Sequence, residues 1–292
     1  MNDKFQELFE QYDFSLTDAK VKAAVDKIVS DNFDRNNEKA VYSKILSFID
    51  VTSLNSTDSA DSIVEFTEKV NNFDDNFEIL PHPAAICVYP SMVPVVRDTL
   101  SEDIEIAAVA GFPHSQTFLE VKVAEVAMAV MEGATEIDVV FPLGKFLSGN
   151  YEEVYDEIKE IKDACRSAKL KVILETGLFK TSEAIKKASI ISMVAGADFI
   201  KTSTGKVGQG ASLEAAYVMC SAIKEFNSKN KAEVGFKAAG GISETSDAVK
   251  YYSVVESVLG EKWLSPELFR IGASRLVNSL LSSLVGDEVK YF

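Results

Sequence analysis

Histidine and cysteine, on which many metal and redox sites depend, are scarce in this chain of 292 residues. The two histidines, His82 and His114, stand in separate expected loops, which argues against a zinc site because zinc usually takes three or four protein ligands. The three cysteines follow neither metal-binding nor redox spacing; they are Cys87, Cys165 and Cys220. Scattered cysteines of this kind are typical of a reducing compartment, so we expect a cytoplasmic protein.

Long hydrophobic runs and a surplus of basic residues are missing as well. No apolar stretch is long enough to cross a bilayer, and the polar start MNDKFQELFEQY does not resemble a secretion signal. Acidic residues number 45 against 30 basic ones, which gives a formal net charge of −15. Nucleic-acid binding requires a basic face that neutralises phosphates. We therefore expect neither a nucleic-acid partner nor a membrane partner.

What the sequence does contain is a regular alternation of two patterns. Short β-branched or apolar runs end in polar clusters, and most precede a segment with apolar residues at helical spacing, as in Val154, Ile158 and Ile161. Eight runs are expected to be strands: 45–50, 84–89, 105–110, 135–140, 170–175, 198–202, 233–237 and 268–271. Helices are expected at 117–132, 150–168, 182–195, 211–227, 245–259 and 274–284.

Eight strands that alternate with helices predict a parallel sheet, and this number favours closure into a single (β/α)8 TIM barrel of the α/β class. The alternative is an open doubly wound sheet, which would usually carry a glycine fingerprint after its first strand; none stands there. Residues 1–40 are expected to form an additional helical N-terminal segment, and residues 41–292 the catalytic barrel.

Ionisable residues interrupt five of the eight expected strands. They are Asp50 at the end of the first, Glu136 and Asp138 in the fourth, Lys171 and Glu175 in the fifth, Lys201 in the sixth and Lys237 in the seventh. Any one of them could be a solvated strand end. Together they would place several charges inside a barrel, which is costly unless the charges compensate one another. Such arrangements mark functional sites more often than structural ones.

Lys201 and Lys237 belong to adjacent strands, and a pair of neighbouring ammonium groups predicts amine chemistry. A free lysine, with a pKa of about 10.4, is neutral in roughly one molecule in 2,500 at pH 7. A second ammonium about 5 Å away disfavours the charged form by about 3.3 kcal/mol, or roughly 2.4 pKa units. An amine activated in this way forms a Schiff base with carbonyls, while a carboxylate moves protons. Charge alone does not fix the nucleophile; we take Lys201, with Lys237 as the neighbour that activates it.

Glycine-bearing turns follow the last three expected strands, where barrels of this class often bind phosphate. They are TSTGK (202–206), AAGGIS (238–243) and IGAS (271–274). Glycine lets backbone N–H groups converge on an anion, and Ser274 is expected to cap the following helix and donate to phosphate. STGK is not a nucleotide-binding P-loop, because that motif needs glycine in place of Ile200 and Ser or Thr in place of Val207.

Several motifs together resemble the deoxyribose-phosphate aldolase family: FIKTSTGK, FKAAGGI, EIDVV, KVILETG, AAICVYP, GFPH and RIGAS. The resemblance covers about residues 45–280. It implies a (β/α)8 class I aldolase of deoxyribonucleotide catabolism that uses no metal or other cofactor. It further implies reversible cleavage of 2-deoxy-D-ribose 5-phosphate to acetaldehyde and D-glyceraldehyde 3-phosphate through a lysine Schiff base, by a monomer or a homodimer.

The resemblance also implies roles for single residues. Lys201 corresponds to the Schiff-base lysine, Lys237 to the second lysine that activates it, and Asp138 to the carboxylate of the proton relay. Supporting positions are Lys171, Asp50 and, beside the substrate, Thr204. The phosphate-binding positions are Gly205, Lys206, Gly240, Gly241, Gly272 and Ser274.

The chain departs from the family's usual residues in places. Ala238 stands where proline or serine is frequent, which should loosen the loop slightly without removing a functional group. Other residues are also common in place of Ile242, Ser243 and Arg275, which bears on the fine contacts to phosphate. Some members end in a mobile tail whose terminal tyrosine assists proton transfer, and Tyr291 is the candidate here. Two other functions stay open: a Schiff-base aldolase for a different phosphorylated sugar, and a catalytically silent barrel that only binds sugar phosphates.

Overall fold

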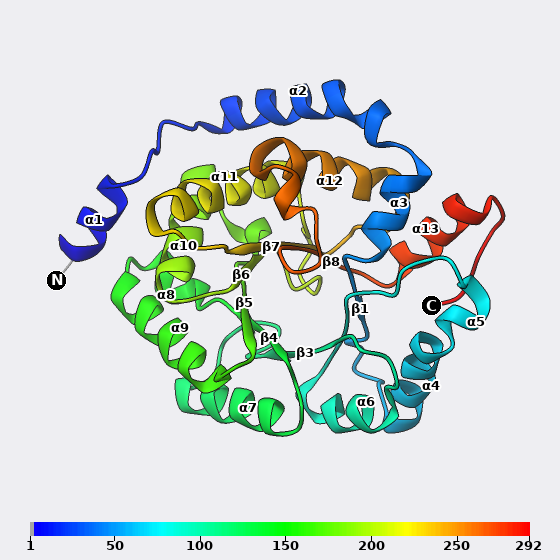
Figure 1. Cartoon of the computed structure of the whole chain (residues 1–292). Coiled ribbons are helices and arrows are strands. Elements are labelled where there is room, and N and C mark those ends of the chain that lie inside the picture. The colour runs from blue at the N-terminus through cyan, green and yellow to red at the C-terminus, as the bar shows by residue number, and fades with distance from the viewer. Residues whose placement is uncertain (1–2) are drawn as a thin grey trace.

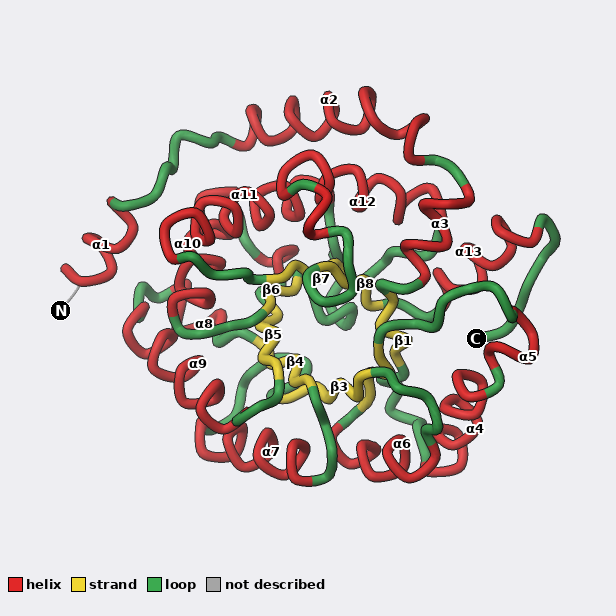
Figure 2. Tube along the Cα trace, in the orientation of Figure 1, coloured by secondary structure: helices red, strands yellow, loops and turns green. Residues whose placement is uncertain are grey.

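A closed barrel of eight parallel strands forms the centre of the computed structural model, which describes residues 3–292 (Figures 1 and 2). Each strand pairs with its neighbours in sequence, and β8 pairs with β1. The strands are β1 (Ile49–Thr52), β2 (Ala85–Val88), β3 (Glu105–Ala110), β4 (Glu136–Val140), β5 (Lys169–Ile173), β6 (Phe199–Lys201), β7 (Gly235–Ala239) and β8 (Phe269–Gly272). The predicted (β/α)8 fold is confirmed, and the open sheet is excluded.

Helices surround this barrel and cover the outer face of the strands (Figure 2). Those that follow strands β1 to β8 are α4 (Ala60–Asn71) and α5 (Phe73–Phe77), α6 (Val93–Thr99), α7 (Leu119–Met131), α8 (Leu143–Leu147) and α9 (Tyr151–Cys165), α10 (Ser182–Val194), α11 (Leu213–Asn230), α12 (Thr245–Leu259) and α13 (Arg275–Val285). In α9 the periodic apolar residues Val154, Ile158 and Ile161 are all buried. The burial of one such stripe holds each helix against the barrel.

The start of the first strand differs from the prediction. Residues 45–50 were expected to be extended, but α3 (Lys39–Leu46) continues through Leu46, and β1 begins only at Ile49. A short apolar run such as ILSF does not distinguish the buried end of a helix from a strand. Asp50 consequently lies inside β1 and not at its end. Strand β7 is also shifted, to Gly235–Ala239, so Lys237 lies at its centre.

Of the three helices that precede β1, α1 and α2 lie against the outer helical layer (Figure 1). Helix α1 (Asp3–Glu10) places Phe5 and Phe9 edge-on against the ring of Tyr151 in α9. Helix α2 (Asp18–Asn36) packs along α11 and α12, where Arg35 forms an ion pair with Glu256 at 2.6 Å. Within residues 3–292, no helix combines the length and the apolar character needed to cross a membrane.

Part of the barrel interior is apolar. A small cluster beside β2 and β3 consists of Leu54, Cys87, Ala107 and Val109. On β7, a Cβ atom added to Gly235 would lie 2.3 Å from the ring of Phe199, so this ring occupies the space of the missing side chain. The Nζ atom of Lys171 lies 5.9 Å from the centre of the same ring. The remainder of the interior carries charge.

Candidate active site

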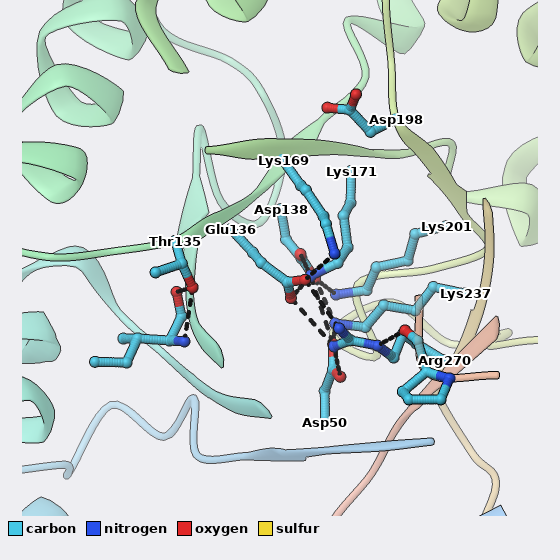
Figure 3. Close-up of polar contacts among 12 residues, drawn as sticks. Asp50, Thr135, Glu136, Asp138, Lys169, Lys171, Asp198, Lys201, Lys237 and Arg270 are labelled. Carbon is cyan, nitrogen blue, oxygen red and sulfur yellow. Dashed lines mark hydrogen bonds and ion pairs between the residues drawn. The ribbon is translucent and has the colours of Figure 1, made fainter. Parts of the chain in front are cut away.

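Seven charged side chains meet inside the barrel (Figure 3). They are Asp50 of β1, Glu136 and Asp138 of β4, Lys171 of β5, Lys201 of β6, Lys237 of β7 and Arg270 of β8, and we call them the interior ion cluster. Their relative exposures lie between 0 and 3%. The register explains the meeting, because Lys201 pairs with Lys237, and Lys237 with Arg270, and paired residues of parallel strands share a face.

The two predicted catalytic lysines converge on one carboxylate. Lys201 Nζ and Lys237 Nζ each lie 2.7 Å from Asp138 Oδ2 and donate a hydrogen bond to it. Lys237 also donates to Asp50, whereas Asp138 is the only carboxylate among residues 3–292 that pairs with Lys201. The three residues assigned to the reaction from sequence are thus brought together in one place.

Lys171 and Asp50, expected to support the site, belong to the same network. Lys171 donates to Glu136, and its Nζ atom lies 3.3 Å from Asp138 Oδ1 and 3.7 Å from Asp50 Oδ2. Asp138 Oδ1 itself accepts no hydrogen bond from the described part of the chain. Its nearest cation in the cluster is Lys171, so this oxygen is held by charge and not by a hydrogen bond.

Arg270 is the member of the cluster that sequence reasoning missed. Its guanidinium donates to Asp50 Oδ1 at 2.7 Å and to Glu136 Oε1 at 3.0 Å, and its Nε donates to the Pro266 carbonyl. The signal was present, because an arginine within the apolar run LFRI satisfies the criterion that selected the other charged strand residues. Arg270 fixes the two carboxylates that Lys171 and Lys237 contact.

Neighbouring carboxylates raise the pKa values of two lysines, Lys237 and Lys171. Burial disfavours the ammonium of Lys237, but the carboxylates of Asp138 and Asp50 outweigh this effect and raise the pKa of Lys237 above its usual range. Burial acts in the same way on Lys171, where Asp138, followed by Glu136 and Asp50, raises the pKa above the ordinary lysine value. Both side chains therefore stay charged near neutral pH.

The charge balance of the cluster leaves one proton in excess. Three carboxylates face four cationic side chains, so the cluster carries one net positive charge when all are ionised. Arg270 cannot release a proton in a protein, and Lys171 and Lys237 each contact two or more carboxylates. Lys201, by contrast, has a single carboxylate partner, Asp138.

A cavity of about 260 Å³ opens at the C-terminal ends of the strands, and Lys201 is the member of the ion cluster that lines it. Thr204 lines it too, as do all six expected phosphate-binding residues: Gly205, Lys206, Gly240, Gly241, Gly272 and Ser274. Gly205 has a φ of 74° and Gly240 a φ of 91°, a region that strains residues with a side chain. The cations Lys206 and Arg275 also face this cavity, which suits an anion.

The prediction that Ser274 caps the last helix is wrong. Ser274 precedes α13, but its side chain forms no capping hydrogen bond. Its hydroxyl instead accepts from Thr52 N at 2.9 Å and donates to Thr52 O at 2.7 Å. These bonds join the turn after β8 to the end of β1, so the serine closes the rim of the barrel and its hydroxyl hydrogen is already engaged.

Several other candidates lie outside the cluster. Tyr291 donates to Lys69 O at 2.7 Å, and its ring packs edge-on against Phe73 and Phe77, so the tail is docked on α4 and α5. Burial raises the pKa of the Cys87 thiol, as suits a packing residue. Within residues 3–292, no group of three or more histidine, cysteine, aspartate or glutamate side chains is arranged to hold a metal ion.

Comparison with known proteins identifies the family. A family model described as DeoC/LacD family aldolase matches residues 44–256. The chain belongs to this family. The aldolase is 43% identical over 246 residues to a Caenorhabditis elegans protein provisionally named deoxyribose-phosphate aldolase, covering 82% of this chain and 80% of that one.

Solved structures agree with the aldolase fold. A deoxyribose phosphate aldolase from Aeropyrum pernix, described as a unique tetramer, is 26% identical and superposes with a TM-score of 0.67 over 87% of this chain and 96% of its own. A Toxoplasma gondii protein provisionally named deoxyribose-phosphate aldolase superposes with a TM-score of 0.77 over 87% of this chain and 97% of its own. At 18% identity, the latter supports the fold alone.

Proposed function

We propose that this aldolase reversibly cleaves 2-deoxy-D-ribose 5-phosphate to acetaldehyde and D-glyceraldehyde 3-phosphate through a Schiff base on Lys201. The observation that carries the proposal is the position of Lys201. It is the member of the ion cluster that lines the cavity at the C-terminal ends of the strands, and it contacts a single carboxylate. The names of the Caenorhabditis elegans and Aeropyrum pernix relatives support the choice of substrate.

The chemistry begins at the aldehyde carbon of the open-chain sugar. The neutral amine of Lys201 adds to C1, and the resulting carbinolamine takes up one proton and loses water to give a protonated Schiff base. A base takes the proton of the C3 hydroxyl, the C2–C3 bond breaks, and its electron pair enters the Schiff base to form an enamine, while glyceraldehyde 3-phosphate leaves. Protonation of the enamine at C2, followed by hydrolysis, releases acetaldehyde and restores the lysine. The protonated Schiff base is the electron sink, so the scheme needs no metal.

We assign the proton transfers to Asp138, with Lys237 as the permanent cation beside the nucleophile. Asp138 Oδ2 contacts Lys201 Nζ at 2.7 Å, and its Oδ1 accepts no hydrogen bond from the described residues. Lys171 and Asp50 hold this carboxylate and Lys237 in place. The turns after β6, β7 and β8, together with Lys206, would bind the phosphate.

Borohydride reduction in the presence of acetaldehyde, followed by peptide mass spectrometry, tests the proposal. We expect an N-ethyl group on Lys201 in the wild-type protein and none at this position in Lys201→Leu, whose far-ultraviolet circular dichroism should match the wild type. An adduct on Lys237 instead, or no adduct at all, would contradict the assignment. Faster turnover of another phosphorylated sugar would identify a different aldolase, and ligand binding without products would identify a silent barrel.

A further inference from the structure

Glu175 is a buried charged residue that the scheme above does not use. It lies two residues beyond β5, is 4% exposed, and has left-handed backbone angles of φ 61° and ψ 57°, which cost a non-glycine residue roughly 1–2 kcal/mol. Amides on both sides hold it there, since Leu174 N donates to Lys201 O and Thr176 N donates to Thr202 O, each at 2.9 Å. Glu175 therefore does not join the interior face with Lys171, as alternation along the expected strand predicted.

The carboxylate is directed at the turn after β6. Both of its oxygens lie 3.3 Å from Thr204 N, and Oε2 also accepts from the Thr204 hydroxyl. That hydroxyl in turn accepts from Lys206 N at 3.1 Å. An ionised carboxylate only accepts, so the hydroxyl hydrogen must point to Glu175, which leaves an oxygen lone pair for Lys206 N. The chain of hydrogen bonds spans Gly205 and fixes its turn.

Charge pairing does not explain this buried acid, because Glu175 forms no ion pair with a lysine or arginine of residues 3–292 at the 4.0 Å limit. Thr204, Gly205 and Lys206 line the cavity at the C-terminal ends of the strands, whereas Glu175 does not, so Glu175 can act on a ligand there only through the turn that it contacts. We propose that Glu175 is a positioning residue that sets the turn Thr204–Lys206 for the phosphate of the substrate. The inference rests on the proposed function, because it assumes a phosphorylated substrate.

The test compares cleavage of 2-deoxyribose 5-phosphate with that of unphosphorylated 2-deoxyribose. We expect Glu175→Ala to raise KM for the phosphorylated sugar by about tenfold or more, with kcat and the kcat/KM for the unphosphorylated sugar changed by less than about threefold. Inhibition by inorganic phosphate should weaken by the same factor as KM. Glu175→Gln retains an acceptor for Thr204, so its KM for the phosphorylated sugar should lie close to the wild-type value. The matched control is Glu160→Ala, at an exposed position on α9.

A double-mutant cycle shows whether Thr204 transmits the effect. Thr204→Val removes the hydroxyl, and adding Glu175→Ala to it should raise KM by clearly less than the product of the two single effects. Equal losses on both sugars, or fully independent effects of the two variants, would overturn the proposal. If Glu175→Ala does not fold, Thr204→Val alone carries the comparison of the two sugars: a loss confined to the phosphorylated sugar supports the proposal, and an equal loss on both overturns it.

The two proposals fail in different ways. Trapping of acetaldehyde on Lys201 involves no phosphate, so an error in the proposed function appears as a missing adduct in the wild-type protein. If the role of Glu175 is wrong, the adduct still forms, but Glu175→Ala does not impair cleavage of the phosphorylated sugar more than that of the unphosphorylated sugar.

Discussion

Lys201 and Lys237 donate hydrogen bonds to the same oxygen of Asp138, each across 2.7 Å. The carboxylate offsets part of the repulsion between the two ammonium groups, so this pair alone does not determine which amine is neutral. With all seven groups ionised, the ion cluster carries one uncompensated positive charge. Of the three lysines in the cluster, Lys201 is the one that lines the cavity and contacts a single carboxylate.

Removal of the neighbouring cation should shift the pH dependence of catalysis. In Lys237→Leu the cluster is neutral with Lys201 protonated, so the amine loses its proton only at higher pH. We expect the acid limb of kcat/KM to move upward by about one to two pH units and the activity at pH 7 to fall about tenfold or more. The control is Lys169→Leu, a partly exposed lysine whose Nζ lies 3.9 Å from Glu136. An unmoved limb in Lys237→Leu would contradict the role of this lysine.

Asp50 should make stability sensitive to acid. Burial disfavours its ionised form, but Lys237, followed by Arg270 and Lys171, outweighs burial and lowers the pKa of Asp50 below its usual range. A carboxylate of this kind stabilises the fold above its unfolded pKa of about 3.9 and ceases to do so as pH falls towards the lower folded value.

Asp50→Asn should therefore lower the free energy of unfolding by about 3–5 kcal/mol at pH 7. The difference from the wild type should shrink as pH falls below about 4. Urea unfolding over this pH range measures it. A difference that stays constant from neutral to acid pH would show that ionisation of Asp50 does not matter.

Arg270 should stabilise the barrel through its shape as well as its charge. Arg270→Leu leaves Asp50 and Glu136 short of a cation, which we expect to cost about 3–5 kcal/mol. Arg270→Lys retains the charge, but a single ammonium cannot reproduce the planar fork, so a smaller loss of about 1–2 kcal/mol is expected. Exposed Arg97→Lys should lose less than about 1 kcal/mol in the same urea titration. Equal stability of Arg270→Leu and wild type would refute the prediction.

The turns after β6 and β7 should tolerate alanine at one glycine but not at another. A Cβ atom on Gly210 would lie 2.3 Å from Gly240 O, whereas nothing lies within 4 Å of a Cβ atom on Gly208. Gly210→Ala should push the two turns apart and raise KM for the phosphorylated sugar by about tenfold, and Gly208→Ala should change it little. Similar KM values for the two variants would mean that the spacing of the turns does not control binding.

The sequence predicted the barrel and most of the ion cluster because both follow from local patterns. Alternating strand and helix signals set the fold, and charged residues within apolar strands marked Asp138, Lys201 and Lys237. The arrangement of partners did not follow, since it depends on strand register: Asp138 serves both lysines, and the surplus charge is evident only once Arg270 is placed in the interior.

The other errors arose at the ends of strands. Alternation of side chains holds only while the backbone stays extended, and β5 ends at Ile173, before Glu175 turns into a left-handed conformation. For Ser274, a residue directly before a helix reads as a cap in sequence, yet Thr52 of a distant strand competes for its hydroxyl. Contacts between segments far apart in sequence decided both cases.

The contact between Gly235 and Phe199 limits how this barrel could be re-engineered. The aromatic ring fills the place of a side chain on β7, and its centre lies 5.9 Å from Lys171 Nζ, so it borders the ion cluster. An engineer who wishes to deepen the pocket for longer aldehydes cannot do so at position 235 alone, because any larger residue there would displace the ring. Positions 199 and 235 would have to be redesigned as a pair.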